Sequence, residues 1–150
     1  MYWGTVMPNG LVWLKEVGHR FNSQNYVQLL QEYAVLIWNL NLSPGYQIVQ
    51  DNAPIHISKL VKEFMKEQQF KFMEYPPKSP DLNPMENIWK LLSDYVYQEN
   101  QPNNHNELRS KIHQAVNFIN VNKRDVIIKM FKDYRRRLTN VLLCGGNIVN

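Results

Sequence analysis

The sequence predicts an α/β fold, in which a mixed sheet is flanked by helices and two further helices follow. Three observations support this class. An Asn-Gly turn signal near the N-terminus predicts a β-hairpin, apolar residues at helical spacing predict amphipathic helices, and Pro and Gly breaks separate short strands from them. The expected order is β-β-α-β-α-β-α, a mixed layer to which the last helices are added.

The first third of the chain carries the strand and turn signals. Residues 2–7 and 11–17 flank the tripeptide Pro-Asn-Gly, so we expect them to pair as a hairpin. Residues 23–38 place apolar side chains at helical spacing, which predicts an amphipathic helix. A Pro-Gly pair then breaks the chain before a short strand at residues 46–50.

The rest of the chain is predicted to be mainly helical. A further strand is expected at residues 71–75, followed by a rigid loop at 76–84 that contains four prolines. Pro84 suits the first position of a helix whose N-cap is Asn83. Helices are expected at residues 58–68, 84–97, 105–119 and 123–143.

The length of 150 residues suits one domain with a sizeable core. Its net charge of +4 is unevenly distributed. Residues 1–100 carry eight Lys and Arg against ten Asp and Glu, whereas residues 101–150 carry nine against three. We therefore expect a slightly acidic body, residues 1–100, with basic C-terminal helices, residues 101–150, packed on the same domain. Such an asymmetry suits an anionic partner.

Cys144 is the only cysteine, which excludes an internal disulfide and a cysteine-based zinc site. A single cysteine agrees with a reducing compartment, the cytosol or the nucleus. No apolar run approaches the roughly 20 residues that cross a bilayer, so no membrane is expected as a partner. The first residues resemble no signal or transit peptide and read as a strand already under way.

Two carboxylates stand out because each follows or begins a rigid element. Asp51 lies where a predicted strand ends, and Glu86 lies in the first turn of a predicted helix. Carboxylates placed in this way on separate elements can form a divalent-metal site for phosphoryl transfer. Each also has a structural explanation: Glu86 fits a capping box with Asn83, and an Asp after a strand commonly forms a turn.

The segments QDNAPIH (residues 50–56) and PPKSPDLNPMENIW (residues 76–89) resemble the second and third catalytic motifs of the mariner/Tc superfamily of DDE transposases. Their spacing resembles that of family members whose third acid is glutamate. Residues 2–4 resemble a strand before the hairpin turn, and residues 130–146 resemble the closing helix. The resemblance thus extends over nearly the whole chain.

This resemblance implies a ribonuclease H-like fold with Asp51 and Glu86 as the second and third catalytic acids. Together with a first Asp they would hold two Mg²⁺ or Mn²⁺ ions, which the family uses to nick transposon ends and join them to target DNA. DNA is therefore the expected partner and the nucleus the expected location. Asp81 lies within the motif, and we expect it to cap the loop.

Several neighbours of these acids remain open to two interpretations. Asn52 either ties the turn, which we favour, or hydrogen-bonds a ligand, and His56 either meets DNA phosphate or caps the next helix. We expect Trp89 to fill the core behind the site. The tentative DNA contacts are Lys129, Lys132, Arg135, Arg136 and Arg137. Cations near a helix C-terminus can also be placed there by the helix dipole.

The family's first catalytic Asp has no counterpart in residues 1–50, where Glu16 and Glu32 are the only acids and match other family positions. We therefore expect a catalytic domain that lacks its first strand, binds metal weakly, folds marginally and does not cleave DNA alone. Two alternatives are a domesticated DNA-binding or regulatory protein, and a subunit that associates with itself or with a full-length transposase.

Overall fold

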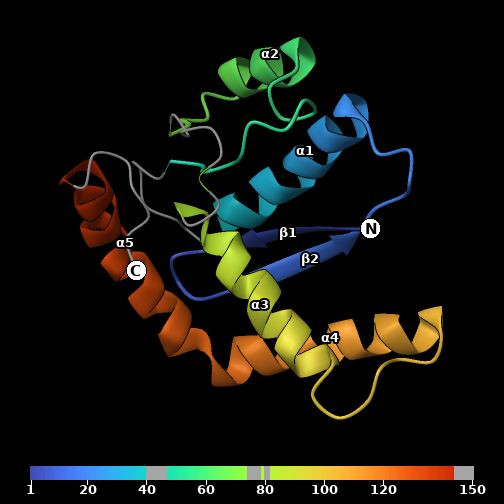
Figure 1. Cartoon of the computed structure of the whole chain (residues 1–150). Helices are drawn as coiled ribbons and strands as arrows, with labels where there is room; N and C mark the ends of the chain where they lie inside the picture. The colour runs from blue at the N-terminus through green and yellow to red at the C-terminus, as the bar shows by residue number, and fades with distance from the viewer. Residues whose placement is uncertain (40–46, 74–78, 80–81, 144–150) are drawn as a thin grey trace. The chain divides into compact units, whose positions relative to one another are not determined.

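The computed structural model describes residues 1–39, 47–73, 79 and 82–143 (Figure 1). The chain divides into two compact units. The first contains Met1–Glu16 and Pro80–Asn150, and the second contains Val17–Ser79. The predicted division near residue 100 stays a prediction.

The first unit begins with the expected hairpin. Strands β1 (Tyr2–Val6) and β2 (Val12–Glu16) pair antiparallel, with Val6 opposite Val12 at the turn end. Gly10 adopts a φ of 86°, a left-handed conformation that side chains on a β-carbon disfavour. The predicted Pro-Asn-Gly turn is therefore confirmed, and the glycine in it is required by the backbone.

Three helices complete this unit: α3 (Pro84–Val96), α4 (His105–Asn122) and α5 (Arg124–Leu143). Helix α3 packs against β1 and α4, and α4 also contacts β2 and α5 (Figure 1). The buried cluster at their centre consists of Val12, Ile88, Leu92, Val96, Ala115, Ile119 and Ile127. The three predicted helices are confirmed to within a few residues. No helix in the described ranges is long and apolar enough to span a membrane.

Polar side chains tie the hairpin to α4 and α5 over long sequence separations. The Asn120 side chain accepts a hydrogen bond from the Val12 amide at 2.8 Å and donates one to the Val12 carbonyl at 3.0 Å. Asn120 thereby satisfies both backbone groups of a buried strand residue, as a neighbouring strand would. The Arg124 Nε donates to the Asn9 carbonyl at 2.9 Å and anchors the turn.

A third tie is ionic and predicts a pH dependence. Arg109 Nη2 lies 2.7 Å from Glu16 Oε2, and this hydrogen bond and charge hold the pKa of Glu16 below its ordinary value. A carboxyl group whose pKa is lower in the folded state than in the unfolded state stabilises the fold at any pH above its unfolded-state pKa. This stabilisation is lost as the pH falls through the folded-state pKa. We expect Glu16→Gln to reduce acid destabilisation below about pH 4.3, in urea titrations read by tryptophan fluorescence.

The control for this prediction is Glu99→Gln, which removes an exposed carboxylate of the same unit that has no ion pair among the described residues. It should leave the acid limb of the stability curve unchanged. An equal effect of both variants would mean that net charge, and not the Arg109 contact, sets the acid dependence.

The second unit contains α1 (Ser23–Asn39) and α2 (Lys59–Glu67), which pack together. Ser58 caps α2, because its Oγ accepts from the Val61 amide at 3.4 Å. Both predicted helices are confirmed. Where two strands were expected, at residues 46–50 and 71–75, the described residues form one parallel bridge between Ile48 and Phe72. Residues 46, 74 and 75, which belong to the two expected strands, lie outside the described ranges.

Candidate functional site

Asp51 follows the Ile48 bridge and begins a tight turn in the second unit. Its Oδ1 accepts a hydrogen bond from the Ala53 amide at 3.1 Å, an Asx-turn that fixes the carboxylate orientation. The same oxygen lies 2.6 Å from Nδ1 of His56. The side chain is 55% exposed, and its Oδ2 has no hydrogen-bond partner among the residues that the structure describes. Asp51 is therefore oriented by one oxygen and offers the other to a ligand.

His56 is itself held in place. Its ring packs on the Tyr26 ring with centroids 4.5 Å apart, and its side chain is 20% exposed. The Tyr26 hydroxyl donates to Gln50 Oε1 at 2.8 Å, and Gln50 Nε2 donates to the His56 carbonyl at 3.4 Å. This arrangement makes His56 a positioning residue for Asp51, and the helix-capping interpretation is wrong because Ser58 caps α2.

Sequence reasoning missed Tyr26 and Gln50 as supports of this turn. Tyr26 lies among residues 23–38, whose apolar spacing predicts only a helix, and its side chain is 2% exposed. Its hydroxyl contact with Gln50 joins residues 24 positions apart. No local sequence pattern marks such a pair, because neither residue type nor spacing distinguishes it from an ordinary core tyrosine.

Glu86 is the third residue of α3 in the first unit. Asn83 caps the helix by accepting from the Met85 amide at 3.0 Å. The Glu86 side chain is exposed, and its carboxylate makes no hydrogen bond or ion pair within the described ranges. The capping-box interpretation of Glu86 is therefore wrong, since Asn83 caps the helix without a reciprocal bond. A free carboxylate at this position remains available for a ligand.

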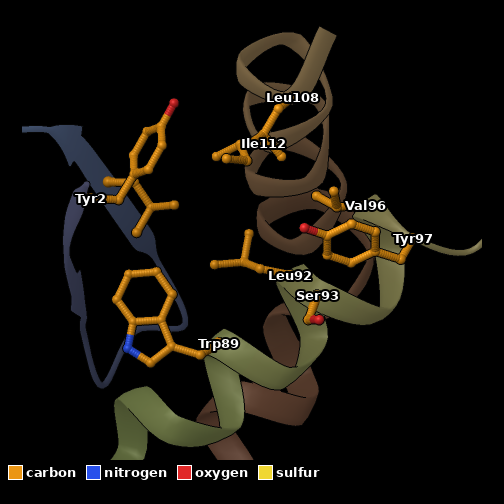
Figure 2. Close-up of a pocket in the computed structure, with 9 residues that line it drawn as sticks. Tyr2, Trp89, Leu92, Ser93, Val96, Tyr97, Leu108 and Ile112 are labelled. Atoms are coloured by element: carbon orange, nitrogen blue, oxygen red, sulfur yellow. The ribbon is translucent and has the colours of Figure 1, made fainter. Parts of the chain in front are cut away.

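The apolar face of α3 explains the role of Trp89. Trp89 is partly buried against the central cluster, which confirms its predicted packing role. Figure 2 shows it beside Tyr2, with Tyr97 across a pocket of about 160 Å³. The pocket is smaller than the roughly 300–1,000 Å³ typical of small-molecule sites. We interpret it as a packing gap beside the central cluster.

A larger cavity of about 440 Å³ adjoins Asp51 in the second unit. We call it the α2 hollow. Its lining residues are Gln50, Asp51, Asn52, His56, Ile57, Val61, Lys62, Met65, Lys66, Phe70, Phe72 and Met73. Asn52 is exposed at its edge, and both interpretations of that residue remain predictions. A cavity of this size beside an oriented carboxylate can admit part of a substrate.

The candidate DNA contacts lie along α5. Lys129 and Lys132 are exposed, and Arg136 is 74% exposed with Asp133 3.8 Å away. The side chains of Arg135 and Arg137 lie outside the described residues. The last turn of α5 contains no basic residue, so the helix-dipole explanation does not account for these cations.

Two other cations of this unit have structural contacts instead. Lys123 lies over the Phe118 ring at 6.0 Å, and Arg124 binds the hairpin turn. Both were counted in the basic surplus from the sequence, and both have a structural role within the unit. Asp81, the expected loop cap, lies outside the described residues.

No group of three or more His, Cys, Asp or Glu side chains that could hold a metal ion occurs in the described part of the chain. Asp51 and Glu86 belong to different compact units. Each therefore supplies carboxylate oxygens, the donors that Mg²⁺ prefers, without forming a complete site within its own unit.

The sequence from residue 2 to residue 109 matches the family model described as DDE superfamily endonuclease. The chain belongs to this family. The Tc3 transposase of Caenorhabditis elegans is 27% identical and matches all of the chain. The Tc1 transposase of the same organism is 29% identical over 61% of the chain. The chain spans 45% and 34% of these relatives, less than half the length of either.

Solved structures show the same fold. The Mos1 transposase catalytic domain, in a structure with raltegravir and Mn, superposes with a TM-score of 0.80 at 13% identity. The match covers 99% of this chain and 76% of that one. A Mos1 mariner paired end complex with Mn matches with a TM-score of 0.55 over 86% of this chain and 43% of that one, at 14% identity. The fold is therefore ribonuclease H-like, and this DDE-family chain is similar to the catalytic-domain region of mariner/Tc-type transposases.

Proposed function

We propose that this DDE catalytic-domain region serves metal-dependent cleavage and joining of DNA strands, with Asp51 and Glu86 as metal ligands. One observation carries the proposal: within the described residues, both motif carboxylates keep oxygens without a protein partner. Most exposed carboxylates on a protein surface are also free, but these two lie in the segments 50–56 and 76–89 that resemble the family's catalytic motifs, within the range that the family model matches. For Glu86 this removes the capping-box explanation, whereas Asp51 forms the predicted turn with Oδ1 and keeps Oδ2 for a ligand.

The donor set suits the metals that such chemistry uses. Carboxylate oxygens are hard ligands, which favour Mg²⁺ or Mn²⁺ over softer transition metals. A divalent ion at such a site supplies charge stabilisation to the oxygens of a reacting phosphate. Asp51 would present Oδ2, while His56 and the Ala53 amide hold Oδ1. Glu86 would present its carboxylate to a metal ion from the N-terminal turn of α3.

The related structures support divalent metal and DNA as ligands. Mos1 catalytic-domain structures contain Mn or Mg, and another Mos1 structure is a paired end complex. We extend these properties to this chain as part of the proposal, with transposon-end and target DNA as substrates. Exposed Lys129 and Lys132 on α5 supply cations for DNA phosphates.

Neither unit holds a complete metal site within its described residues. We therefore expect the isolated 150 residues to leave DNA uncut, because a further ligand is needed to hold two ions. Nuclear localisation and association with a second copy or a full-length transposase stay predictions. A domesticated, purely DNA-binding protein is not favoured, since such a protein needs no free carboxylates at these positions.

Metal binding can be tested on the full chain without a cleavage assay. Titration with Mn²⁺ should broaden the backbone amide signals around Asp51 and around Glu86, because the paramagnetic ion relaxes nearby nuclei. Asp51→Asn should remove the first effect and Glu86→Gln the second, since each variant loses an anionic oxygen ligand. The measurement is a nuclear magnetic resonance titration of assigned amides.

Asp94→Asn provides the matched control, because Asp94 is exposed on the same helix as Glu86 and lies outside the motif. It should leave both sets of signals as in the unmodified chain. Uniform weak broadening at all exposed carboxylates would contradict the proposal. Mg²⁺-dependent nicking by the isolated chain that disappears in Glu86→Gln would contradict the expected inactivity.

A further inference from the structure

We propose that the α2 hollow receives one unstacked nucleobase from the DNA strand whose phosphate lies at Asp51. This inference rests on the proposed function, which places a DNA strand at that carboxylate. The hollow of about 440 Å³ lies within the usual size range of ligand sites, and Asp51 and Asn52 form part of its wall. A nucleotide next to the reacting phosphate is therefore within reach of it.

The floor of the hollow is apolar and aromatic. Val61 and Met65 are 1% and 4% exposed, and Phe70 and Phe72 are half-buried. Aromatic side chains provide stacking faces for bases of any sequence, because every base has a π-face. An apolar floor with two phenylalanines thus matches the faces of a nucleobase.

The rim carries the complementary charge. Lys62 and Lys66 line the hollow one helical turn apart, and within the described residues neither has a carboxylate partner. Lys59, on the same helix, instead lies 3.7 Å from Glu63. Two unpaired ammonium groups beside an aromatic floor suit a nucleotide, which combines a flat base with anionic phosphates. A purely apolar ligand would have no anionic group to pair with these two lysines.

Occupation by a base has a consequence for substrate choice. A base can enter only after it leaves its stack, and this costs least where the base is unpaired or mismatched. The chain should therefore bind single-stranded DNA, or DNA with an unpaired base near the bound phosphate, more tightly than a fully paired duplex. Paired DNA would contact the rim lysines without filling the hollow.

The test uses the full chain and a short single-stranded oligonucleotide that contains the fluorescent base analogue 2-aminopurine. Binding should change the emission of the analogue, and Phe70→Leu or Phe72→Leu should remove that change while keeping an apolar floor. The dissociation constant should rise roughly fivefold or more for the variant that loses the stacking ring. Both variants are made because a base stacks on one ring, and the comparison identifies which phenylalanine supplies it.

A second comparison tests the role of the lysines: Lys62→Glu is compared with Lys59→Glu, an identical change on the same helix. Lys62→Glu should weaken binding and lower the slope of log affinity against log salt by about 0.7, the value for one phosphate contact on a single strand. Lys59→Glu should leave the emission change intact. Equal effects of the two variants would overturn the rim assignment, because they would show a response to helix charge alone.

The remaining outcomes separate this inference from the proposed function. DNA binding with an unchanged 2-aminopurine signal, and with no effect of either phenylalanine variant, would overturn the inference and leave the proposed function standing. Absence of any DNA binding would overturn both. Equally tight binding of free 2-aminopurine deoxyribonucleoside monophosphate would identify a mononucleotide site and overturn the assignment to a strand.

Discussion

Ile88→Ala is expected to destabilise the first unit by roughly 2–5 kcal/mol, the usual range for truncating a fully buried isoleucine. Ile88 is 0% exposed and lies in the cluster where α3 meets β2, α4 and α5. The truncation removes apolar contacts and leaves a cavity that the packed helices can close only partly. Urea denaturation followed by tryptophan fluorescence measures the loss, since Trp3, Trp13 and Trp89 belong to this unit.

The change also bears on function, because Ile88 lies two residues after Glu86 on α3. Loosening of this helix should broaden the amide signals around Glu86 in the absence of metal. Truncation of an exposed side chain of the same unit, Val121→Ala on α4, should cost much less, since Val121 is 78% exposed. Equal losses at the two positions would show that the apolar cluster does not anchor α3.

Gly10→Ala should lower the free energy of unfolding by roughly 2–5 kcal/mol, the sum of left-handed backbone strain and overpacking. A β-carbon on Gly10 would lie 2.8 Å from the Arg124 carbonyl oxygen and 2.5 Å from Arg124 Cγ. The carbonyl is backbone at the start of α5, so it cannot move aside as a flexible side chain can. The variant should therefore displace α5 from the hairpin, which thermal denaturation would detect.

Two further substitutions separate strain from collision. Gly18→Ala should be neutral or slightly stabilising, since a β-carbon there has no atom within 4 Å and less backbone freedom is lost on folding. Asparagine adopts a positive φ more readily than alanine does. The β-carbon of Gly10→Asn would nevertheless meet the same Arg124 carbonyl. If Gly10→Asn were as stable as the unmodified chain, the close approach of Arg124 would not matter to the fold.

Local signals in the sequence determined the elements well. The Pro-Asn-Gly turn, the Asn83 cap with Pro84, and the helical spacing of apolar residues each depend on residues within a few positions of one another. The hairpin and the helices could therefore be predicted closely. The two strands expected at residues 46–50 and 71–75 were less predictable, and their contact through the Ile48–Phe72 bridge was not predicted, because pairing depends on partners distant in the chain.

The candidate site shows the same division between local and long-range information. The motifs identified Asp51 and Glu86, but two uses of each carboxylate were compatible with the sequence. Capping boxes and metal ligands employ the same residue types at the same positions, so only side-chain geometry distinguishes them. The structure shows that Asn83 caps α3 alone and that His56 holds one oxygen of Asp51.

The sequence by itself determined the family, the order of helices and the two acidic motif residues, because these are written in contiguous segments. Only the tertiary structure decided which polar groups meet across the chain. Asn120 pairs with Val12 over 108 positions and Arg124 with Asn9 over 115. The α2 hollow likewise gathers residues from 50 to 73. Such contacts follow from how packed elements place distant side chains together, and no local pattern encodes that placement.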